Sequence, residues 1–169
     1  MSLEQDIIGW DGASSNDIEV IYRRYGEDSF FLNEIIRFLN NKALQKAATW
    51  LLKRTFDDQE TIGQSEVKAV YDFLPGLEHW ESKLHVLQCI PFMPVPISQK
   101  KVVEMFLRDC LADRNKFVRA WAYNGFYELS VQYPEYEKET KQIFDMAMRD
   151  ESPSVKARIR NVMKKWASN

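Results

Sequence analysis

The sequence predicts an all-α protein, an α-solenoid of about four stacked helical hairpins. Four stretches, which begin at Leu44, Ser82, Val118 and Val155, carry the same helical pattern of apolar residues at steps of 38, 36 and 37. Glycine and proline are few, at six each, and the strict apolar-polar alternation of half-buried strands is scarce. A helix face that recurs at a near-constant step is typical of stacked helical repeats, in which each unit buries its apolar stripe against its neighbours.

The apolar face occupies the start of each stretch and the positions four, seven, eight and eleven residues later, which share one side of a helix. We number these repeat positions from zero. The predicted buried residues are Leu44, Ala48, Leu51, Leu52, Thr55; Ser82, Val86, Cys89, Ile90, Met93; Val118, Ala122, Gly125, Phe126, Leu129; and Val155, Ile159, Val162, Met163, Trp166.

A second pattern precedes each of the later stretches and predicts the first helix of each hairpin. Its members are Val70, Tyr71, Leu74, Pro75; Phe106, Leu107, Cys110, Leu111; and Ile143, Phe144, Ala147, Met148. The four stretches above then form the second helices. The earliest hairpin does not fit this pattern, and terminal units of repeat proteins are often irregular.

Turn and cap signals predict the helix boundaries in order. The opening, residues 1–15, has mixed signals, and we expect it to be poorly ordered or a short cap; Met1, Ser2 and Leu3 are given no weight. Gly26 ends the first helix, Pro75-Gly76 ends the fourth, and Ser152-Pro153 begins the last. The expected helices are Asn16–Tyr25, Ser29–Leu39, Lys42–Phe56, Ser65–Leu74, His79–Ile90, Ser98–Ala112, Asn115–Gln132, Glu135–Arg149 and Ser152–Trp166.

Composition predicts one domain over residues 1–169 in a reducing, cytoplasmic setting. No linker divides the chain, and the two cysteines do not make a disulfide framework. No run of 18 apolar residues exists and the opening lacks a signal-peptide pattern, so we expect no membrane association. The formal net charge of −2 and the isoelectric point near 5.8 give no overall attraction to nucleic acid.

The third and fourth units, residues 107–129 and 144–166, resemble HEAT repeats. In each, an aspartate is followed five residues later by valine and a base, Asp113 before Val118-Arg119 and Asp150 before Val155-Lys156. The resemblance implies a ladder in which the turn aspartate caps the second helix or pairs with a base of the neighbouring unit. The first two units depart from the pattern, with Leu39 and Leu77 in place of the aspartate, so the ladder is implied for the third and fourth units only. An unrelated helical bundle remains the alternative.

No catalytic residue, cofactor site or metal site is predicted. Glu81, His85 and Cys89 lie four residues apart and invite interpretation as a thiolate-imidazole pair or a partial metal site. Cys89, however, occupies the same repeat position as Leu51 and Val162, which predicts a buried and inert thiol. Cys110 aligns with Ala147 in the first-helix pattern, and the same interpretation applies to it.

The predicted function is non-catalytic binding of a protein or peptide along a groove lined by the second helices. Repeat positions one, five and nine are expected to form an exposed strip beside the buried face, joined by position six. Tyr, Trp and Arg dominate interface hot spots. The alternative is that these rings cover core edges and these bases are merely solvated. The candidate partner-binding residues are Trp50, Lys83, Arg119, Tyr123, Asn124, Tyr127, Lys156 and Arg160.

Nucleic acid is the second candidate partner. Residues 152–169 carry five bases and no acid, whereas residues 1–30 carry seven acids and two bases. A basic last helix suits phosphates, but it also suits the helix C-terminus on which it lies. HEAT-like DNA alkylation-repair glycosylases are similar in architecture, and Trp121, Tyr123 and Asp113 are the residues that would serve that role here. The overall acidity disfavours it.

Overall fold

The computed structural model describes residues 1–168, which form ten α-helices and four short 3-10 turns with no strand. The helices are α1 (Leu3–Ile8), α2 (Ser15–Tyr25), α3 (Phe31–Phe38), α4 (Gln45–Asp57), α5 (Gln64–Asp72), α6 (Trp80–Cys89), α7 (Lys100–Leu111), α8 (Lys116–Gln132), α9 (Glu137–Asp150) and α10 (Pro153–Ala167). None of the helices in residues 1–168 combines the length and apolarity that crossing a membrane requires.

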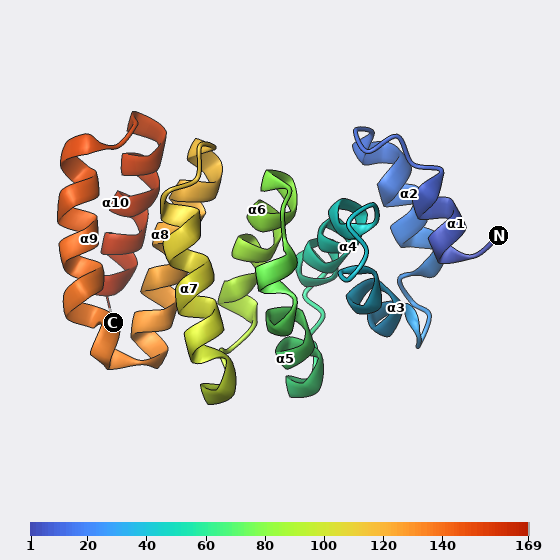
Figure 1. Ribbon diagram of the computed structural model, residues 1–169, viewed down its shortest axis with the longest axis horizontal. Helices are drawn as coiled ribbons and strands as arrows, with labels where there is room; N and C mark the ends of the chain where they lie inside the picture. Colours follow the sequence, from blue (N-terminus) through green and yellow to red (C-terminus); the bar gives the residue numbers. More distant parts are fainter. Residues whose placement is uncertain (169) are drawn as a thin grey trace.

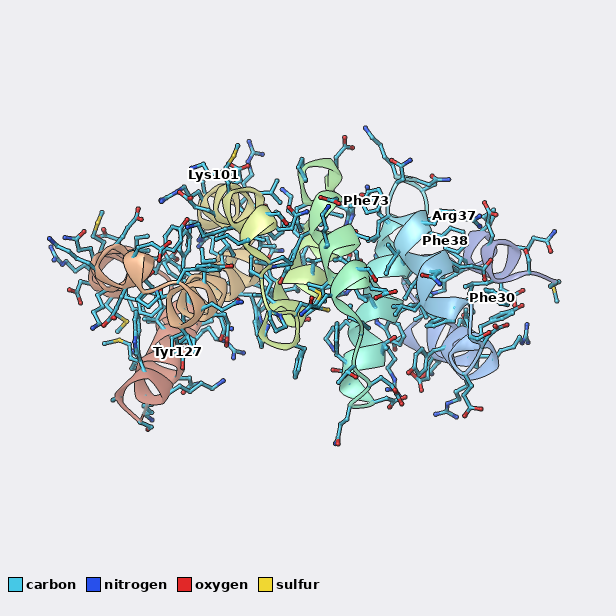
Figure 2. All side chains as sticks on the ribbon, turned by 90° about the horizontal axis from the view of Figure 1, so that it is seen from below. Phe30, Arg37, Phe38, Phe73, Lys101 and Tyr127 are labelled. Carbon is cyan, nitrogen blue, oxygen red and sulfur yellow. The ribbon has the colours of Figure 1, made fainter. Side chains whose placement is uncertain are left out.

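The helices follow one another along the long axis of the molecule, with α1 and α2 at one end and α9 and α10 at the other (Figure 1). The second helices α2, α4, α6, α8 and α10 pack on one another in that order. On the other side α5 packs against α3 and α7, and α3, α7 and α9 each pack against the second helix that follows it. Figure 2 shows Arg37, Phe38, Phe73 and Lys101 along the first-helix edge and Tyr127 on the opposite side.

The predicted buried face of the second helices is confirmed. Of its residues, only Met163, at 43% exposure, and the half-buried Trp166 are not buried. Buried residues from Leu3 to Leu129 form one continuous cluster, and a second cluster between α8, α9 and α10 contains Tyr123, Tyr127 and Phe144. The repeat register therefore marks the side of each helix that faces the core.

The opening, expected to be either poorly ordered or a short cap, contains the short helix α1. Ser2 and Gln5 form a reciprocal capping box, in which Ser2 Oγ accepts from Gln5 N at 3.3 Å and Gln5 Oε1 accepts from Ser2 N at 3.0 Å. Leu3 and Ile7 are buried against the core at 2% and 3% exposure. Residues given no weight in the sequence therefore begin α1, which packs against α2 and covers that end of the core.

Helix ends agree with the predicted boundaries to within a few residues. The helices differ in whether a side chain caps their first turn. Asn115 caps α8, because its Oδ1 accepts from Phe117 N at 2.9 Å. Ser152 occupies the corresponding place before α10, with Pro153 in the first turn, yet its side chain makes no cap hydrogen bond. Ser98, the expected first residue of the next helix, lies in a 3-10 turn that precedes α7, and Gln99 occupies the N-cap position without a side-chain cap hydrogen bond.

Candidate partner-binding face of the second helices

On α8 the strip at repeat positions five and nine does not face solvent, so the expectation of an exposed Tyr123 and Tyr127 is wrong. Tyr123 is 7% exposed and its ring meets Phe144 edge-to-face at 6.0 Å; Tyr127 is 5% exposed and meets Trp166 at 5.5 Å. Figure 2 shows Tyr127 where α8 meets α10. The physical reason is that each second helix has a flank covered by the next one, and these positions lie on that flank.

Arg119 ties α8 to the turn between α9 and α10. Its Nε lies 2.8 Å from Glu151 Oε1 and its Nη2 lies 3.1 Å from Glu151 Oε2, while Nη1 donates to the Asp113 carbonyl at 3.0 Å. The Arg119 guanidinium is the largest influence that lowers the pKa of Glu151 below its ordinary value. Two-point charge-assisted pairs of this kind fix geometry as well as adding energy. Arg119 therefore has a structural role that its repeat position did not predict.

Similar charged contacts join the earlier units. Lys83 Nζ lies 3.4 Å from Asp113 Oδ2, which confirms the expected pairing of the turn aspartate with a neighbouring base. In the fourth unit the partner is Glu151, one residue after the expected Asp150. Lys46 pairs with Glu81 at 2.8 Å, so the first two units are also bridged, which the departures from the HEAT pattern did not predict.

Gln45 supplies a further connection between the first two units. It is 4% exposed, and its Nε2 donates to the carbonyls of Leu39 and Gly76, each at 2.9 Å. Gln45 occupies the repeat position at which the third and fourth units have Arg119 and Lys156, and its buried amide satisfies two backbone carbonyls instead.

Lys156 and Arg160, the predicted site residues of α10, have different surroundings. Lys156 is half-buried and its Nζ donates to the Arg149 carbonyl at 3.4 Å. Arg160 is exposed and forms no ion pair within residues 1–168. Arg160 and Lys164 stand 37 residues after Tyr123 and Tyr127, so the outer flank of α10 carries cations where the same flank of α8 carries buried rings.

The surface left uncovered on the second helices comprises repeat positions three, six and ten. Successive helical residues are rotated by about 100°, which places these three positions opposite the flank toward the first helices. We call them the second-helix face; its residues on α6, α8 and α10, with Trp50 of α4, are Trp50, His85, Gln88, Phe92, Trp121, Asn124, Glu128, Arg158, Asn161 and Lys165. All except Asn124 are half-buried or exposed. Of the predicted site residues, Trp50 and Asn124 belong to this face.

The most distinctive part of the second-helix face lies between α8 and α10. The Arg158 guanidinium stacks over the Trp121 ring, with Cζ 4.1 Å from the ring centroid. Asn124, on the same side of α8 and 2% exposed, has an Nδ2 that finds no acceptor within residues 1–168. Glu128, one turn further on, is half-buried, and desolvation raises the pKa of its carboxyl while the nearby Lys165 acts to lower it.

Cys89 and Cys110 are buried, as their repeat positions predicted, and His85 is half-buried. Cys89 is 0% exposed and burial raises the pKa of its thiol; burial also raises the pKa of the Cys110 thiol to about 12. Desolvation lowers the pKa of His85 to about 4, so the ring is neutral near pH 7. No three His, Cys, Asp or Glu side chains within residues 1–168 gather in a metal-binding arrangement. A protonated thiol beside a neutral imidazole is not an activated nucleophile.

A recess between α2 and the end of α4 was not anticipated from the sequence. Its walls include Tyr22, Phe31 and Ile62. Arg54 crosses it, paired with Glu19 at 2.9 Å and with Asp58, and lies over the Tyr22 ring at 4.8 Å. The polar groups of Arg54 are therefore satisfied within the protein, and this network joins α2 to α4.

No protein family, curated protein or solved structure matches this chain. The residues that sequence reasoning missed on the second-helix face are chiefly Glu128, Arg158 and Lys165. They occupy repeat positions ten, three and ten of the register already found in the sequence. The repeat positions of these residues could be read from the sequence. The sequence did not show which of the two flanks of each second helix a neighbouring helix covers.

Proposed function

We propose that this protein is a HEAT-like α-solenoid that binds an extended segment of a protein or peptide partner along its second-helix face, without catalysis. The solenoid is supported by the succession of packed second helices and by the charged pairs Lys46–Glu81, Lys83–Asp113 and Arg119–Glu151 between units. The α1–α2 hairpin then acts as an irregular first unit whose capping box and buried leucine cover one end of the stack.

The observation that carries the binding proposal is the pair of unsatisfied groups between α8 and α10. Asn124 Nδ2 is buried without an acceptor, which costs about 1–3 kcal/mol relative to a satisfied amide. Arg158, which lies over the same part of α8, forms no ion pair within residues 1–168. Native proteins satisfy nearly all buried polar groups, so exceptions point to a role. A partner that brings carboxylate oxygens to this face supplies acceptors for Arg158, which is only half-buried.

The burial of the potential nucleophiles supports binding over covalent chemistry. Cys89 and Cys110 lie in the core at 0% and 1% exposure, with thiol pKa values raised by burial. Neither sulfur reaches the second-helix face, where a substrate would have to bind.

A nucleic-acid or DNA-repair role is the second candidate, and the bases of α10 favour it. Against it, Trp121 and Tyr123 are two residues apart and so point about 200° away from each other around α8. Tyr123 is buried between α8 and α9, and Asp113 is paired with Lys83. The three residues suggested for base capture therefore do not line one groove.

Selection from a random peptide library tests the proposed function. The selected peptides are measured for affinity to the wild type, to a Gln88→Ala/Asn161→Ala variant of the second-helix face, and to a Met105→Ala variant. Met105 is 55% exposed on α7, on the first-helix side, and serves as the matched surface control. We expect the face variant to weaken binding by about tenfold, equivalent to about 1.4 kcal/mol, and the control to leave it unchanged.

Two results would contradict the proposal. One is a selected peptide that binds the face variant as tightly as the wild type while the Met105→Ala variant loses affinity. The other is a library that yields no peptide with saturable binding. Circular dichroism melting curves of all three proteins verify that a lost affinity does not reflect unfolding.

A further inference from the structure

Ion pairing divides the chain into two parts. Within residues 1–168, every lysine and arginine up to Arg108 forms an ion pair with a carboxylate, although that part carries more than half of the bases. Beyond Arg108 only Arg119 and Lys141 do so. The bases without such a pair are Arg114, Lys116, Lys138, Arg149, Lys156, Arg158, Arg160, Lys164 and Lys165. Lysines and arginines without an ion pair within residues 1–168 therefore lie only around α8, α9 and α10.

Arg158 is the unpaired base whose geometry best suits a ligand. Its Cζ lies over the Trp121 ring, 4.1 Å from the centroid, and its N–H donors form no ion pair within residues 1–168. A stacked arginine loses less conformational freedom when it binds than one that moves freely in solvent. The planar fork of N–H donors matches a carboxylate, which it can bind through two hydrogen bonds.

Carboxamide side chains occupy the same repeat position on α6, α8 and α10 and offer recognition of a peptide backbone. Repeat position six is occupied by Gln88, Asn124 and Asn161 on three successive second helices. Asn161 is exposed, Gln88 is half-buried, and Asn124 retains an Nδ2 without an acceptor. A carboxamide donates and accepts hydrogen bonds, so it complements the carbonyl and N–H groups of an extended chain.

We propose that the α6–α10 part of the second-helix face binds an acidic peptide in extended conformation, an inference that rests on the proposed function. Arg158 and the exposed Lys165 bind carboxylate side chains, and the carboxamides of Gln88 and Asn161 bind the backbone. Neighbouring helices are separated by about 8–10 Å, and an extended chain advances about 3.3 Å per residue. A segment of about six residues therefore reaches from α6 to α10.

Charge favours an acidic peptide over single-stranded nucleic acid. A strand of nucleic acid binds through a positive groove that follows its backbone, with bases stacked on free aromatic faces. On α4 and α6 the bases Lys46, Lys53 and Lys83 are each neutralised by a carboxylate, so the positive surface is confined to one end. One face of the Trp121 ring is already covered by Arg158. A short segment with a few carboxylates fits this limited surface better than a continuous polyanion.

Fluorescence anisotropy with three labelled probes tests the inference: a peptide of about twelve residues that alternates Glu with Ala and Ser, the same peptide with Gln in place of Glu, and an oligothymidylate of similar length. The site variant is Arg158→Gln/Lys165→Gln. The matched control is Lys138→Gln/Arg149→Gln, which removes the same charge from two exposed, unpaired bases at α9. We expect the Glu peptide to bind wild type at least about tenfold more tightly than the Gln peptide, and the site variant to lose about tenfold affinity while the control loses less than about twofold.

Each other outcome overturns the inference in a recognisable way. Equal losses in the site and control variants would mean general charge attraction with no site on α10. Tighter binding of the oligothymidylate than of the Glu peptide would assign the surface to nucleic acid. If library selection yields peptides that require Gln88 and Asn161 but are not acidic, the proposed function stands and the acidic partner is wrong.

Discussion

Thr49 on α4 and His85 on α6, 36 residues apart, share a hydrogen bond with 3.1 Å between Thr49 Oγ1 and His85 Nδ1. The Thr49 hydroxyl also lies 2.9 Å from the Gln45 carbonyl, to which it donates. His85 Nδ1–H is then the donor to Thr49, and the ring is neutral. The contact links two second helices one repeat step apart through a histidine whose pKa is lowered to about 4 by burial.

The protein is expected to lose stability as the pH falls from about 6.5 to 4 because of His85. Desolvation lowers the pKa of His85 from 6.5 to about 4 in the folded protein, so only the unfolded chain binds a proton in this window. The contribution of His85 to the free energy of unfolding is fully present above pH 6.5. Below pH 6.5 it declines by at most about 1.4 kcal/mol per pH unit. Urea denaturation at pH 7, 6 and 5 measures the slope.

His85→Gln keeps a hydrogen-bonding side chain but cannot titrate, so its stability should vary less between pH 7 and 5 than that of the wild type. His79→Gln is the matched control, because His79 is exposed at the start of α6. A slope for His85→Gln that equals the wild-type slope would show that other groups carry the pH dependence.

Removing Arg119 should destabilise the protein by about 1–3 kcal/mol, because it leaves a largely buried Glu151 carboxylate without its main partner. Arg160→Ala removes the same charge from an exposed side chain without an ion pair and should change stability by less than about 0.5 kcal/mol. Chemical denaturation of Arg119→Ala, Glu151→Gln and the double variant completes a thermodynamic cycle. Additive effects in that cycle would contradict a direct interaction between the two side chains.

Ile159→Ala should lower the unfolding free energy by roughly 2–5 kcal/mol, since Ile159 is 0% exposed at repeat position four of α10. Met163, one turn later and 43% exposed, provides the comparison, and Met163→Ala should stay within about 0.5 kcal/mol of wild type. The free energies come from urea titrations followed by circular dichroism. Similar losses for the two variants would mean that the buried and exposed sides of α10 have been misassigned.

Gly125→Ala should destabilise the protein by about 1–3 kcal/mol despite the better helix propensity of alanine. A Cβ at this position would overlap the buried Leu107 side chain and approach Ile90 Cδ1 at 3.6 Å. Gly76→Ala is the control, because no atom lies within 4 Å of a Cβ there. In a Leu107→Ala background the Gly125→Ala change should be less harmful, because the shortened side chain leaves room; an unchanged penalty would point to a backbone cause.

The repeat register in the sequence predicted the core because periodicity reports burial directly. Ala48, Val86, Ala122 and Ile159 all occupy repeat position four, and all are buried. The same reasoning identified Cys89 as a core residue from its alignment with Leu51 and Val162.

The binding face was predicted less well, for a physical reason. Tyr123 and Trp121 both lie outside the core stripe, and a helical pattern alone does not show which of its two flanks a neighbour covers. The stacking direction covers Tyr123 and leaves Trp121 half-exposed. Glu151 was missed because it lies one residue beyond the expected aspartate. This shift falls in a turn, so the apolar pattern of the helices does not reveal it. The capping role of Ser2 was missed because residues 1–3 were given no weight, although Ser2 and Gln5 have the spacing of a capping box.

The cations on the outer flank of α10 have a consequence for self-association. A second copy of this chain that packed on the outer flank of α10 would cover Arg160 and Lys164. The equivalent positions of α8 are Tyr123 and Tyr127, whose rings pack against α9 and α10. Both cations would lose hydration in such an interface and gain no packing of rings in return. Burial of these two cations without counter-charges would cost free energy, so the outer flank of α10 disfavours the docking of a second copy of this chain against it.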